Sequence, residues 1–275
     1  MKAELREIRG IKTYVERHGD RQLPTVLLLH GFTGSTSTWQ ETIKTLTAAY
    51  HVVAVDLIGH GRTEAPLDPA RYCMEEQIKD LHQLLEDLQI ERPIVLGYSM
   101  GGRVALGYTA TYPDQVASLL LESSSPGLRI EEERQARSEA DAKLAARIEQ
   151  HGIEKFVDFW QEIPLFSTQK KLSDEQRLAV RNERLSQQTT GLANSLRGIG
   201  TGKQQSYWDD LARIELPVFL LTGSEDTKFV GIAREMEKYL PNVQHETIKD
   251  AGHAIHVEKP RQFATMIKSY LKAIN

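Results

Sequence analysis

The sequence predicts an α/β fold, with a mostly parallel central sheet flanked by helices and a helical cap inserted between two sheet strands. Three observations predict this fold. Short aliphatic runs alternate with longer amphipathic stretches, as in a sheet covered by helices. The runs are continuously apolar, which is typical of strands that are buried on both faces. A long polar segment without any strand pattern interrupts the alternation before it resumes.

The individual elements follow from these patterns. We expect strands at 26–29, 52–55, 94–96, 118–121 and 218–221. The stretch 74–88 carries apolar residues at helical spacing, and 101–112 is also compatible with a helix. Within the polar segment we expect helices at 131–147, 152–162 and 173–186. Residues 1–125 and 206–275 are therefore expected to form the core, and residues 126–205 the helical cap.

The composition restricts the function classes. A chain of 275 residues with 40% hydrophobic and 26% charged residues suits one globular unit with a sizeable core. A formal net charge of −4 gives no reason to expect nucleic acid or an anionic membrane as a partner. The first residues lack the apolar core of a signal peptide, and the single cysteine, Cys73, excludes an internal disulfide. We expect a cytoplasmic protein; the composition does not specify its oligomeric state.

A candidate nucleophile lies between a predicted strand and a predicted helix. Gly97-Tyr98-Ser99-Met100-Gly101 follows the apolar run 94–96 and matches the G-x-S-x-G nucleophile elbow. The turn forces its central residue into a strained backbone conformation, so its neighbours must be small, and Gly97 and Gly101 satisfy this requirement. The Ser99 hydroxyl would then project at a helix N-terminus, where negative charge is stabilised.

An acid and a base follow in the order that this motif requires. Asp226 comes shortly after the strand 218–221, and His253 comes later still. The order Ser, Asp, His is that of the α/β-hydrolase fold, which the sequence therefore resembles. Competing residues are expected to be structural or solvated; they are Glu225, one residue early, His245, at the start of a strand, and His256, entering the last helix.

Two backbone amides are expected to form an oxyanion hole, those of Phe32 and of Met100. His30 lies upstream of the elbow, so we interpret it as a buttress of the same loop. The Gly-rich segment 56–63 lacks the lysine of a phosphate-binding loop and is interpreted as a tight turn. No pair of His or Cys residues has the spacing of zinc ligands, so no metal site is expected.

Several segments together resemble one family along essentially the whole chain. The sequence is similar to 2-succinyl-6-hydroxy-2,4-cyclohexadiene-1-carboxylate synthases of menaquinone (vitamin K2) biosynthesis. The glycine pair and arginine after the elbow, the Pro-Gly-Leu that opens the cap and the Asp-x-Lys-Phe at the acid are the specific features. The resembling segments are 30–34, 97–103, 125–128, 131–134, 159–161 and 223–229.

The resemblance implies a lyase that uses its triad in an unusual way. The enzyme would remove a proton from the ring of 2-succinyl-5-enolpyruvyl-6-hydroxy-3-cyclohexene-1-carboxylate and expel pyruvate, leaving the conjugated diene. Ser99, activated by His253, would act as the general base, and Asp226 would orient His253. The oxyanion hole would hold charge delocalised onto the succinyl ketone. Neither a cofactor nor a metal is implied.

The implied substrate is a small tricarboxylate, and arginine suits it because its planar fork binds a carboxylate bidentately. Arg103 lies one helical turn after Ser99, so its side chain can stay on the same side of the helix. The resemblance adds Arg137 and Arg181 as cap contacts, with Arg134 an alternative to Arg137. It also implies that the pocket is lined by Tyr98 and Trp160, while Arg147 and Arg184 are expected to lie on the surface.

Two alternatives remain open. A serine hydrolase of the same fold, either an esterase or a carbon–carbon bond hydrolase, would attack with Ser99 or an activated water and would not need three arginines. A non-catalytic binding protein on the same scaffold would be expected to lack a triad member, and all three are present.

Overall fold

The computed structural model describes residues 1–274 and contains one sheet of eight strands in the order β1-β2-β4-β3-β5-β6-β7-β8. From β4 to β8 neighbouring strands are parallel, and the first two strands join antiparallel at one edge. The strands are β1 (Lys2–Ile8), β2 (Ile11–His18), β3 (Thr25–Leu29), β4 (His51–Val55), β5 (Ile94–Tyr98), β6 (Ser118–Glu122), β7 (Val218–Gly223) and β8 (Val243–Ile248).

The five expected strands are confirmed as β3 to β7, to within two residues at each end. Continuous apolar runs identify them because they are buried on both faces: every residue of β4, β5, β6 and β7 is buried. The antiparallel hairpin of β1 and β2 was not predicted from the sequence. β1 is mostly exposed or half-buried and alternates charged with apolar residues, so it lacks the apolar run on which that prediction depended.

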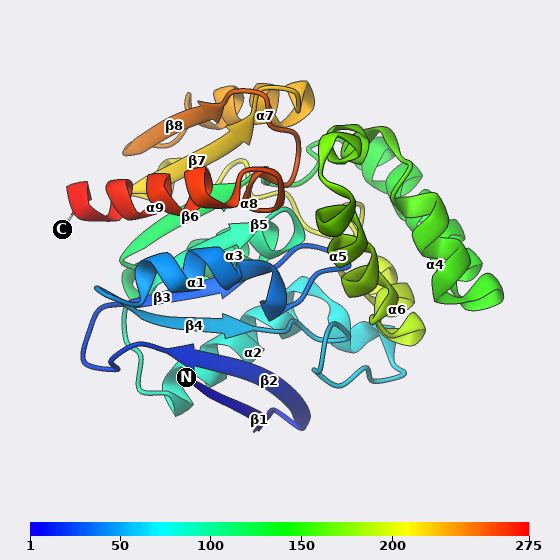
Figure 1. Cartoon of the computed structure of the whole chain (residues 1–275), viewed down its shortest axis with the longest axis horizontal. Helices are drawn as coiled ribbons and strands as arrows, with labels where there is room; N and C mark the ends of the chain where they lie inside the picture. The colour runs from blue at the N-terminus through cyan, green and yellow to red at the C-terminus, as the bar shows by residue number, and fades with distance from the viewer. Residues whose placement is uncertain (275) are drawn as a thin grey trace.

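Helices cover both faces of the sheet (Figure 1). Apolar residues of α1 and α9 pack in one core cluster, and those of α2, α3 and α7 pack in another across the sheet. The expected helices 74–88 and 101–112 are confirmed as α2 and α3. The helices are α1 (Gln40–Leu46), α2 (Met74–Asp87), α3 (Met100–Thr111), α4 (Glu131–Trp160), α5 (Asp174–Leu185), α6 (Thr189–Ile199), α7 (Thr227–Met236), α8 (Ile255–Glu258) and α9 (Pro260–Ile274).

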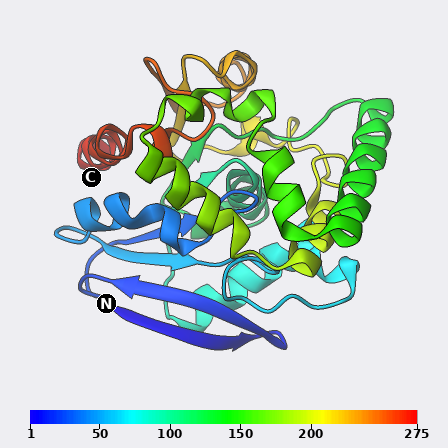
Figure 2. The same ribbon diagram turned by 45° about the vertical axis from the view of Figure 1, so that its right-hand side comes forward.

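Helices α4, α5 and α6 lie between β6 and β7 in the chain and stand over one end of the sheet (Figures 1 and 2). α4 contains a break at Gly152, whose φ of 78° is outside the helical range, so it consists of two helical segments, as expected from the pattern. α4 and α6 pack together through a small apolar cluster of their own, which includes Ile148, Phe156, Leu192 and Leu196.

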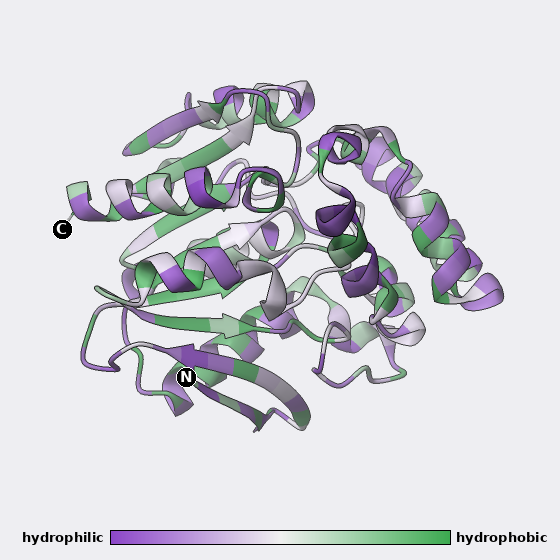
Figure 3. Cartoon of the chain, viewed as in Figure 1, coloured by the Kyte–Doolittle hydropathy of each residue, from purple (hydrophilic) through white to green (hydrophobic). Residues whose placement is uncertain are grey.

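The distribution of hydropathy agrees with this layering. Figure 3 shows hydrophobic residues concentrated in the central strands, whereas hydrophilic and hydrophobic residues alternate along α4. Within residues 1–274, no helix has both the length and the apolar character needed to cross a membrane.

Candidate active site

Ser99 stands at a sharp turn between β5 and α3. Its φ of 48° and ψ of −106° lie outside the regions that L-residues prefer, which is the strain expected of a nucleophile elbow. The turn is held by a hydrogen bond from the Ser99 amide to the carbonyl of Glu122 on β6, at 2.9 Å. A Cβ at Gly101 would lie 2.3 Å from the Leu29 carbonyl oxygen, so only glycine allows α3 to start this close to β3.

The acid, the base and the serine meet in a hydrogen-bonded chain. The Nδ1 of His253 is 2.7 Å from Asp226 Oδ2, and its Nε2 is 3.0 Å from Ser99 Oγ. Because the carboxylate can only accept, Nδ1 carries the proton and Nε2 is free to accept the serine proton. This tautomer is the one that a general base requires.

The loops after β7 and β8 bring Asp226 and His253 to the serine. Both residues are buried, with exposed fractions of 7% and 1%. The two loops approach closely, since a Cβ at Gly223 would lie 2.2 Å from the carbonyl oxygen of Gly252. The His253 ring also contacts Phe229, with ring centroids 4.6 Å apart, and Tyr98, at 5.4 Å. These contacts fix the orientation of the ring.

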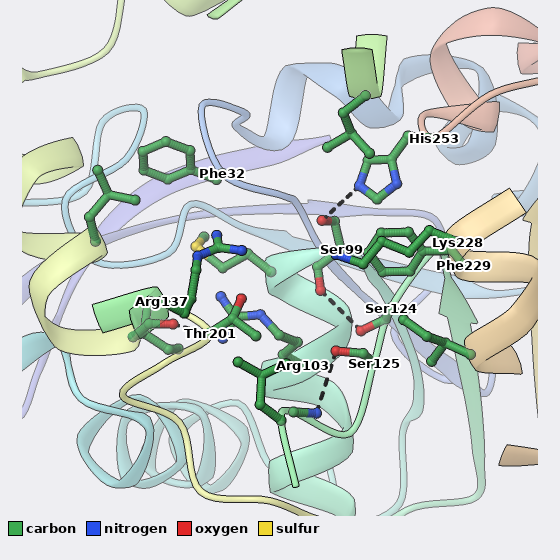
Figure 4. A pocket seen from close by; sticks show the side chains of 18 of the residues that line it. Phe32, Ser99, Arg103, Ser124, Ser125, Arg137, Thr201, Lys228, Phe229 and His253 are labelled. Carbon is green, nitrogen blue, oxygen red and sulfur yellow. Dashed lines mark hydrogen bonds between the residues drawn. The ribbon is translucent and has the colours of Figure 1, made fainter. Parts of the chain in front are cut away.

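A cavity of about 440 Å³ opens above this chain of residues, between the sheet and the cap (Figure 4). Most of its wall is apolar, and Ser99 and His253 are part of it. The apolar and aromatic lining residues include Phe32, Tyr98, Met100, Trp160, Leu165, Phe166, Leu196, Ile199, Trp208, Phe229 and Ile232. A cavity of this size accommodates a small organic molecule.

The expected pocket aromatics both line this cavity. Tyr98 is 8% exposed, and burial, followed by the charge of Glu122, raises its pKa well above the usual value. Trp160 packs edge-on against Phe32, with centroids 5.4 Å apart, and contacts Phe166 at 5.9 Å. Part of the cavity wall therefore comes from α4, which ends at Trp160.

Phe32 and Met100 also line the cavity. Within residues 1–274, neither of their amide N–H groups donates to a protein acceptor, so both are available to a ligand. His30, beside Phe32, is fully buried: its Nδ1 donates to the Gly31 carbonyl at 2.8 Å, and its Nε2 accepts from the Leu57 amide at 2.9 Å. His30 thus joins the loop after β3 to the loop after β4, and its role is structural.

Arg103 is a buried cation of the cavity wall. Its Nη1 donates to the Ile199 carbonyl and to Gln204 Oε1, both at 2.7 Å. Burial, and then the charge of the nearby Arg137, lower the pKa of this guanidinium to about 10, while Asp141 opposes the shift. The side chain nevertheless remains charged at neutral pH.

Arg137 lines the cavity from α4, and Arg134 does not. The Nε of Arg137 donates to Asp141 at 2.8 Å. Arg134 instead pairs with Glu131 and donates to the Leu128 carbonyl at the start of the cap. Arg137 and Arg103 lie near each other on one side of Ser99 in Figure 4.

The expectation for Arg181 needs correction. Arg181 is not among the residues of this cavity; its Nη2 pairs with Asp158 at 2.7 Å and its Nη1 donates to Gln161. The reason is the rotation of α5, which turns this position toward the end of α4. We therefore leave Arg181 out of the proposed carboxylate site.

Arg184 was expected on the surface, and this expectation is wrong. Only 6% of the residue is exposed, because its guanidinium lies 4.5 Å above the ring of Phe166 and donates to Gln169 at 3.0 Å. Phe166 is itself part of the cavity wall. Arg147 is exposed, as expected.

Two further cations line the cavity without a role predicted for them. Lys228 lies on the side of Ser99 opposite Arg103, in the first turn of α7, with its Nζ 5.5 Å from the ring centroid of Phe229. The Asp-x-Lys-Phe segment could have indicated that Lys228 lies in the pocket, because it places Lys228 two residues after Asp226. Arg129 stacks on Trp208, 4.0 Å from its ring centroid.

The competing residues have other partners. Glu225 is exposed and pairs with Lys171 of the cap, at 2.7 Å. His245 lies within β8 and contacts Glu237 at 2.9 Å. His256 belongs to the short helix α8, before the last helix, and is buried beside Glu122. Within residues 1–274, no group of His, Cys, Asp and Glu side chains has the arrangement of a metal site.

Comparisons with known proteins identify the family of the chain. The model of the alpha/beta hydrolase fold family matches residues 24–260. A Bacillus subtilis (strain 168) protein that is provisionally named 2-succinyl-6-hydroxy-2,4-cyclohexadiene-1-carboxylate synthase is 41% identical over 265 residues, which is 96% of each chain. The chain belongs to this synthase family, within the α/β hydrolases.

Other members and structures support the assignment. The synthase of the same name from Enterobacter sp. (strain 638) is 28% identical over 93% of this chain and 95% of its own. The structure of MenH from S. aureus has a TM-score of 0.91 and 35% identity, covering 94% of this chain and 98% of that one. An enol-lactonase from Burkholderia xenovorans, at 20% identity and a TM-score of 0.85, shares the fold.

Proposed function

We propose that the protein eliminates pyruvate from 2-succinyl-5-enolpyruvyl-6-hydroxy-3-cyclohexene-1-carboxylate to give 2-succinyl-6-hydroxy-2,4-cyclohexadiene-1-carboxylate, a step of menaquinone biosynthesis. Membership of the synthase family supports the reaction. The observation that carries the proposal is the position of the Ser99–His253–Asp226 chain at the base of a cavity whose wall holds Arg103 and Arg137. A neutral ester would not require a buried cation such as Arg103 beside the triad.

The chemistry begins with proton transfer. His253 takes the hydroxyl proton of Ser99 as Ser99 Oγ takes a proton from the substrate ring, so the net base is the imidazole. The electron pair of the broken C–H bond delocalises onto the succinyl ketone oxygen, for which the amides of Phe32 and Met100 are the proposed donors. The pair then returns to form a C2–C3 double bond, the existing C3–C4 double bond shifts to C4–C5, and the C5–O bond breaks to release the pyruvate enolate. The enolate takes up a proton and becomes pyruvate, and no water is consumed.

Asp226 acts on the base and not on the substrate. Its carboxylate keeps the proton on Nδ1 of His253, and it stabilises the imidazolium that forms when Nε2 takes the serine proton. Both groups are buried, so the attraction between them is stronger than it would be in water.

The substrate carboxylates would bind to cations of the cavity. We assign Arg103 and Arg137 to this role, with Lys228 at the opposite side as a third cation. We also propose that residues 126–205 act as the cap that closes over the tricarboxylate, since α4 supplies Arg137 and Trp160. The single free cysteine, Cys73, is consistent with the cytoplasmic location that we propose.

The decisive experiment supplies the enolpyruvyl substrate and measures released pyruvate together with the absorbance of the diene. Ser99→Ala should lower kcat by about three orders of magnitude, by analogy with triad knockouts. Asp226→Asn should lower it by up to about four orders, because the wrong tautomer of His253 would be favoured. Glu225→Gln is the matched control and should leave the rate unchanged. A normal rate in Ser99→Ala, or greater damage from Glu225→Gln than from Asp226→Asn, would contradict the proposal.

The serine hydrolase alternative is separated by isotope. A hydrolase places solvent oxygen in its product, whereas the elimination incorporates none. Product formed in water enriched in oxygen-18 should therefore carry no label in its carboxylates, which, unlike the pyruvate carbonyl, do not exchange with water on the assay timescale. Label in a new carboxylate would assign the protein to the hydrolases.

A further inference from the structure

A buried carboxylate lies directly behind the cationic side of the cavity. Asp141 follows Arg137 by one turn of α4, and only 4% of it is exposed. Its Oδ1 accepts from Nε of Arg137 at 2.8 Å. Its Oδ2 is buried and has no hydrogen-bond partner within residues 1–274, and a Cβ at Gly200 would lie 2.5 Å from this oxygen. Gly200 lines the cavity, so the carboxylate packs against a residue of the cavity wall.

This carboxylate acts on both arginines of the wall. Burial raises the pKa of Asp141, and the charges of Arg137 and then Arg103 oppose the shift. Arg103 is lowered in pKa by its own burial and by Arg137, and Asp141 is the acid that offsets these effects. Without Asp141 the two nearby like charges would lose the carboxylate that offsets their repulsion, and Arg103 is buried.

Arg137 binds Asp141 through Nε, which leaves the two Nη groups of its guanidinium free. A guanidinium offers a side edge at Nε and an end fork of two Nη groups. Asp141 occupies Nε, and within residues 1–274 neither Nη group of Arg137 donates to a protein atom. The two Nη groups form the edge that binds a carboxylate through parallel hydrogen bonds.

We propose that Asp141 is a positioning residue for substrate binding. It holds the Arg137 guanidinium side-on through Nε, so that the Nη fork is presented to a substrate carboxylate, and it supplies the negative charge that keeps Arg103 and Arg137 together in the empty cavity. The inference rests on the proposed function, because the ligand is the tricarboxylate substrate. Asp141 itself touches no reacting atom.

The experiment compares the KM and kcat of Asp141 variants in pyruvate release. Asp141→Ala removes the acceptor of Nε and should raise KM about tenfold or more, with kcat within about threefold. Asp141→Asn keeps an acceptor oxygen for the same N–H but removes the charge, so KM should rise less than in Asp141→Ala, to within about threefold of the original. Asp141→Leu fills the same space without an acceptor, and it gives the same test if the alanine variant does not fold. Glu139→Ala, on the exposed side of α4, is the control and should change nothing.

A double-mutant cycle separates positioning from simple structural damage. In an Arg137→Ala background, Asp141→Ala should raise KM by less than about twofold further, because the residue through which it acts is absent. Full additivity of the two changes, or an unchanged KM in both Asp141→Ala and Asp141→Leu, would overturn the inference. A melting temperature that falls while KM stays constant would reduce Asp141 to a structural role.

Calorimetric binding of benzene-1,3,5-tricarboxylate, which cannot react, distinguishes this inference from the proposed function. If the protein releases no pyruvate, the proposed function fails, and the calorimetry alone decides the role of Asp141. The dissociation constant of benzene-1,3,5-tricarboxylate should rise about tenfold in Asp141→Ala and stay within about threefold of the original in Asp141→Asn. No binding by the unaltered protein, or equal binding by all variants, counts against the positioning role.

Discussion

At the scale of single residues, the cavity combines an apolar wall with Arg103, a cation to which no carboxylate of residues 1–274 is hydrogen-bonded. Arg103 donates to a carbonyl and an amide oxygen, and both acceptors are neutral. A buried charge without an ionic partner costs free energy, and an anionic ligand that enters the cavity offsets this cost. The arrangement therefore favours anionic ligands over neutral ones of the same shape.

Arginine substitutions test this argument. Arg103→Ala and Arg137→Ala should each lower kcat/KM by about ten- to hundredfold or more, since a charge-assisted fork contributes about 1.5–3 kcal/mol. The lysine variants keep the charge but lose the planar fork, and should recover only part of the activity. Arg181→Ala and Arg147→Ala are the controls in the same steady-state assay, because both side chains lie outside the cavity. If Arg181→Ala were as damaging as Arg103→Ala, the carboxylate site would need to be redrawn.

The buried histidines of the core give a second prediction at this scale. Burial lowers the pKa of His30 to about 4 and that of His60 to about 3, from 6.5 in the unfolded chain. Below pH 6.5 the unfolded chain therefore binds protons that the folded chain does not. The free energy of unfolding should fall as the pH falls from 6.5 to about 4, by up to about 1.4 kcal/mol per pH unit for each ring.

Urea unfolding of the protein and of His60→Gln at several pH values checks this prediction. The difference between the two isolates His60 from the other groups that titrate in this range. The variant should lose less stability on acidification than the unaltered protein. Parallel curves would show that His60 is protonated equally in the folded and unfolded states.

The residues of the triad could be predicted from sequence because the elbow is a local motif, and the structure brings all three together. The cap arginines could not be predicted as well. Within α5 only Arg184 is buried, so the helix has no apolar stripe to indicate which side faces inward. Without that stripe, the sequence cannot distinguish Arg181 from Arg184, which lies on an adjacent part of the same helix face.

At the scale of elements, the cap helices are joined to the sheet layer by close backbone contact and polar ties. Glu183 on α5 accepts from the Ser35 amide at 3.0 Å and from the hydroxyls of Ser35 and Ser37 at 2.9 and 2.8 Å. At Gly191 on α6, a Cβ would lie only 1.9 Å from the carbonyl oxygen of Gly59. The start of α6 thus touches the core loop directly.

Gly191→Ala tests this contact. The added methyl group cannot fit, so α6 must shift away from the core loop, at a cost typical of overpacking, about 1–3 kcal/mol. Because α6 carries Ser195 and Leu196 of the cavity wall, kcat/KM should also fall.

The matched control is Gly231→Ala on α7, where an added Cβ has no neighbour within 4 Å. That change should raise the free energy of unfolding by about 0.5–1 kcal/mol through helix propensity. Thermal unfolding and steady-state kinetics of both variants decide the matter. Equal stabilisation by the two substitutions would show that α6 does not rest on the core loop.

The strands of the core were predictable because burial on both faces leaves an apolar run, as in β4 and β6. Edge strands escape the same reasoning. β8 is largely exposed or half-buried. It begins at Val243, two residues before His245, where the sequence had placed its start. The pattern in such strands depends on what covers them, which the sequence alone does not record.

At the scale of the whole molecule, the sheet separates two apolar clusters, and the cap has a third of its own. The cap cluster is smaller than either of the two sheet clusters, and α5 contributes only the half-buried Leu185 to it. The elbow adjoins both sheet clusters, since Tyr98 belongs to one and Met100 to the other. Because the cap packs largely through a cluster of its own, we expect it to open at a lower free energy than the core.

Native-state hydrogen exchange tests this division of stability. Amides of β3 and β5, whose residues are almost entirely buried, should exchange only through global unfolding, whereas those of α5 should exchange through local opening at a lower free energy. Helix α9 is the control, because its buried face packs on the sheet and should behave like the core.

Bound tricarboxylate should slow exchange in α5 and leave β5 unchanged, since ligand binding stabilises only the closed arrangement. Exchange of α5 as slow as that of β5 without ligand would mean that cap and core open as one unit, and access to Ser99 would then require another route.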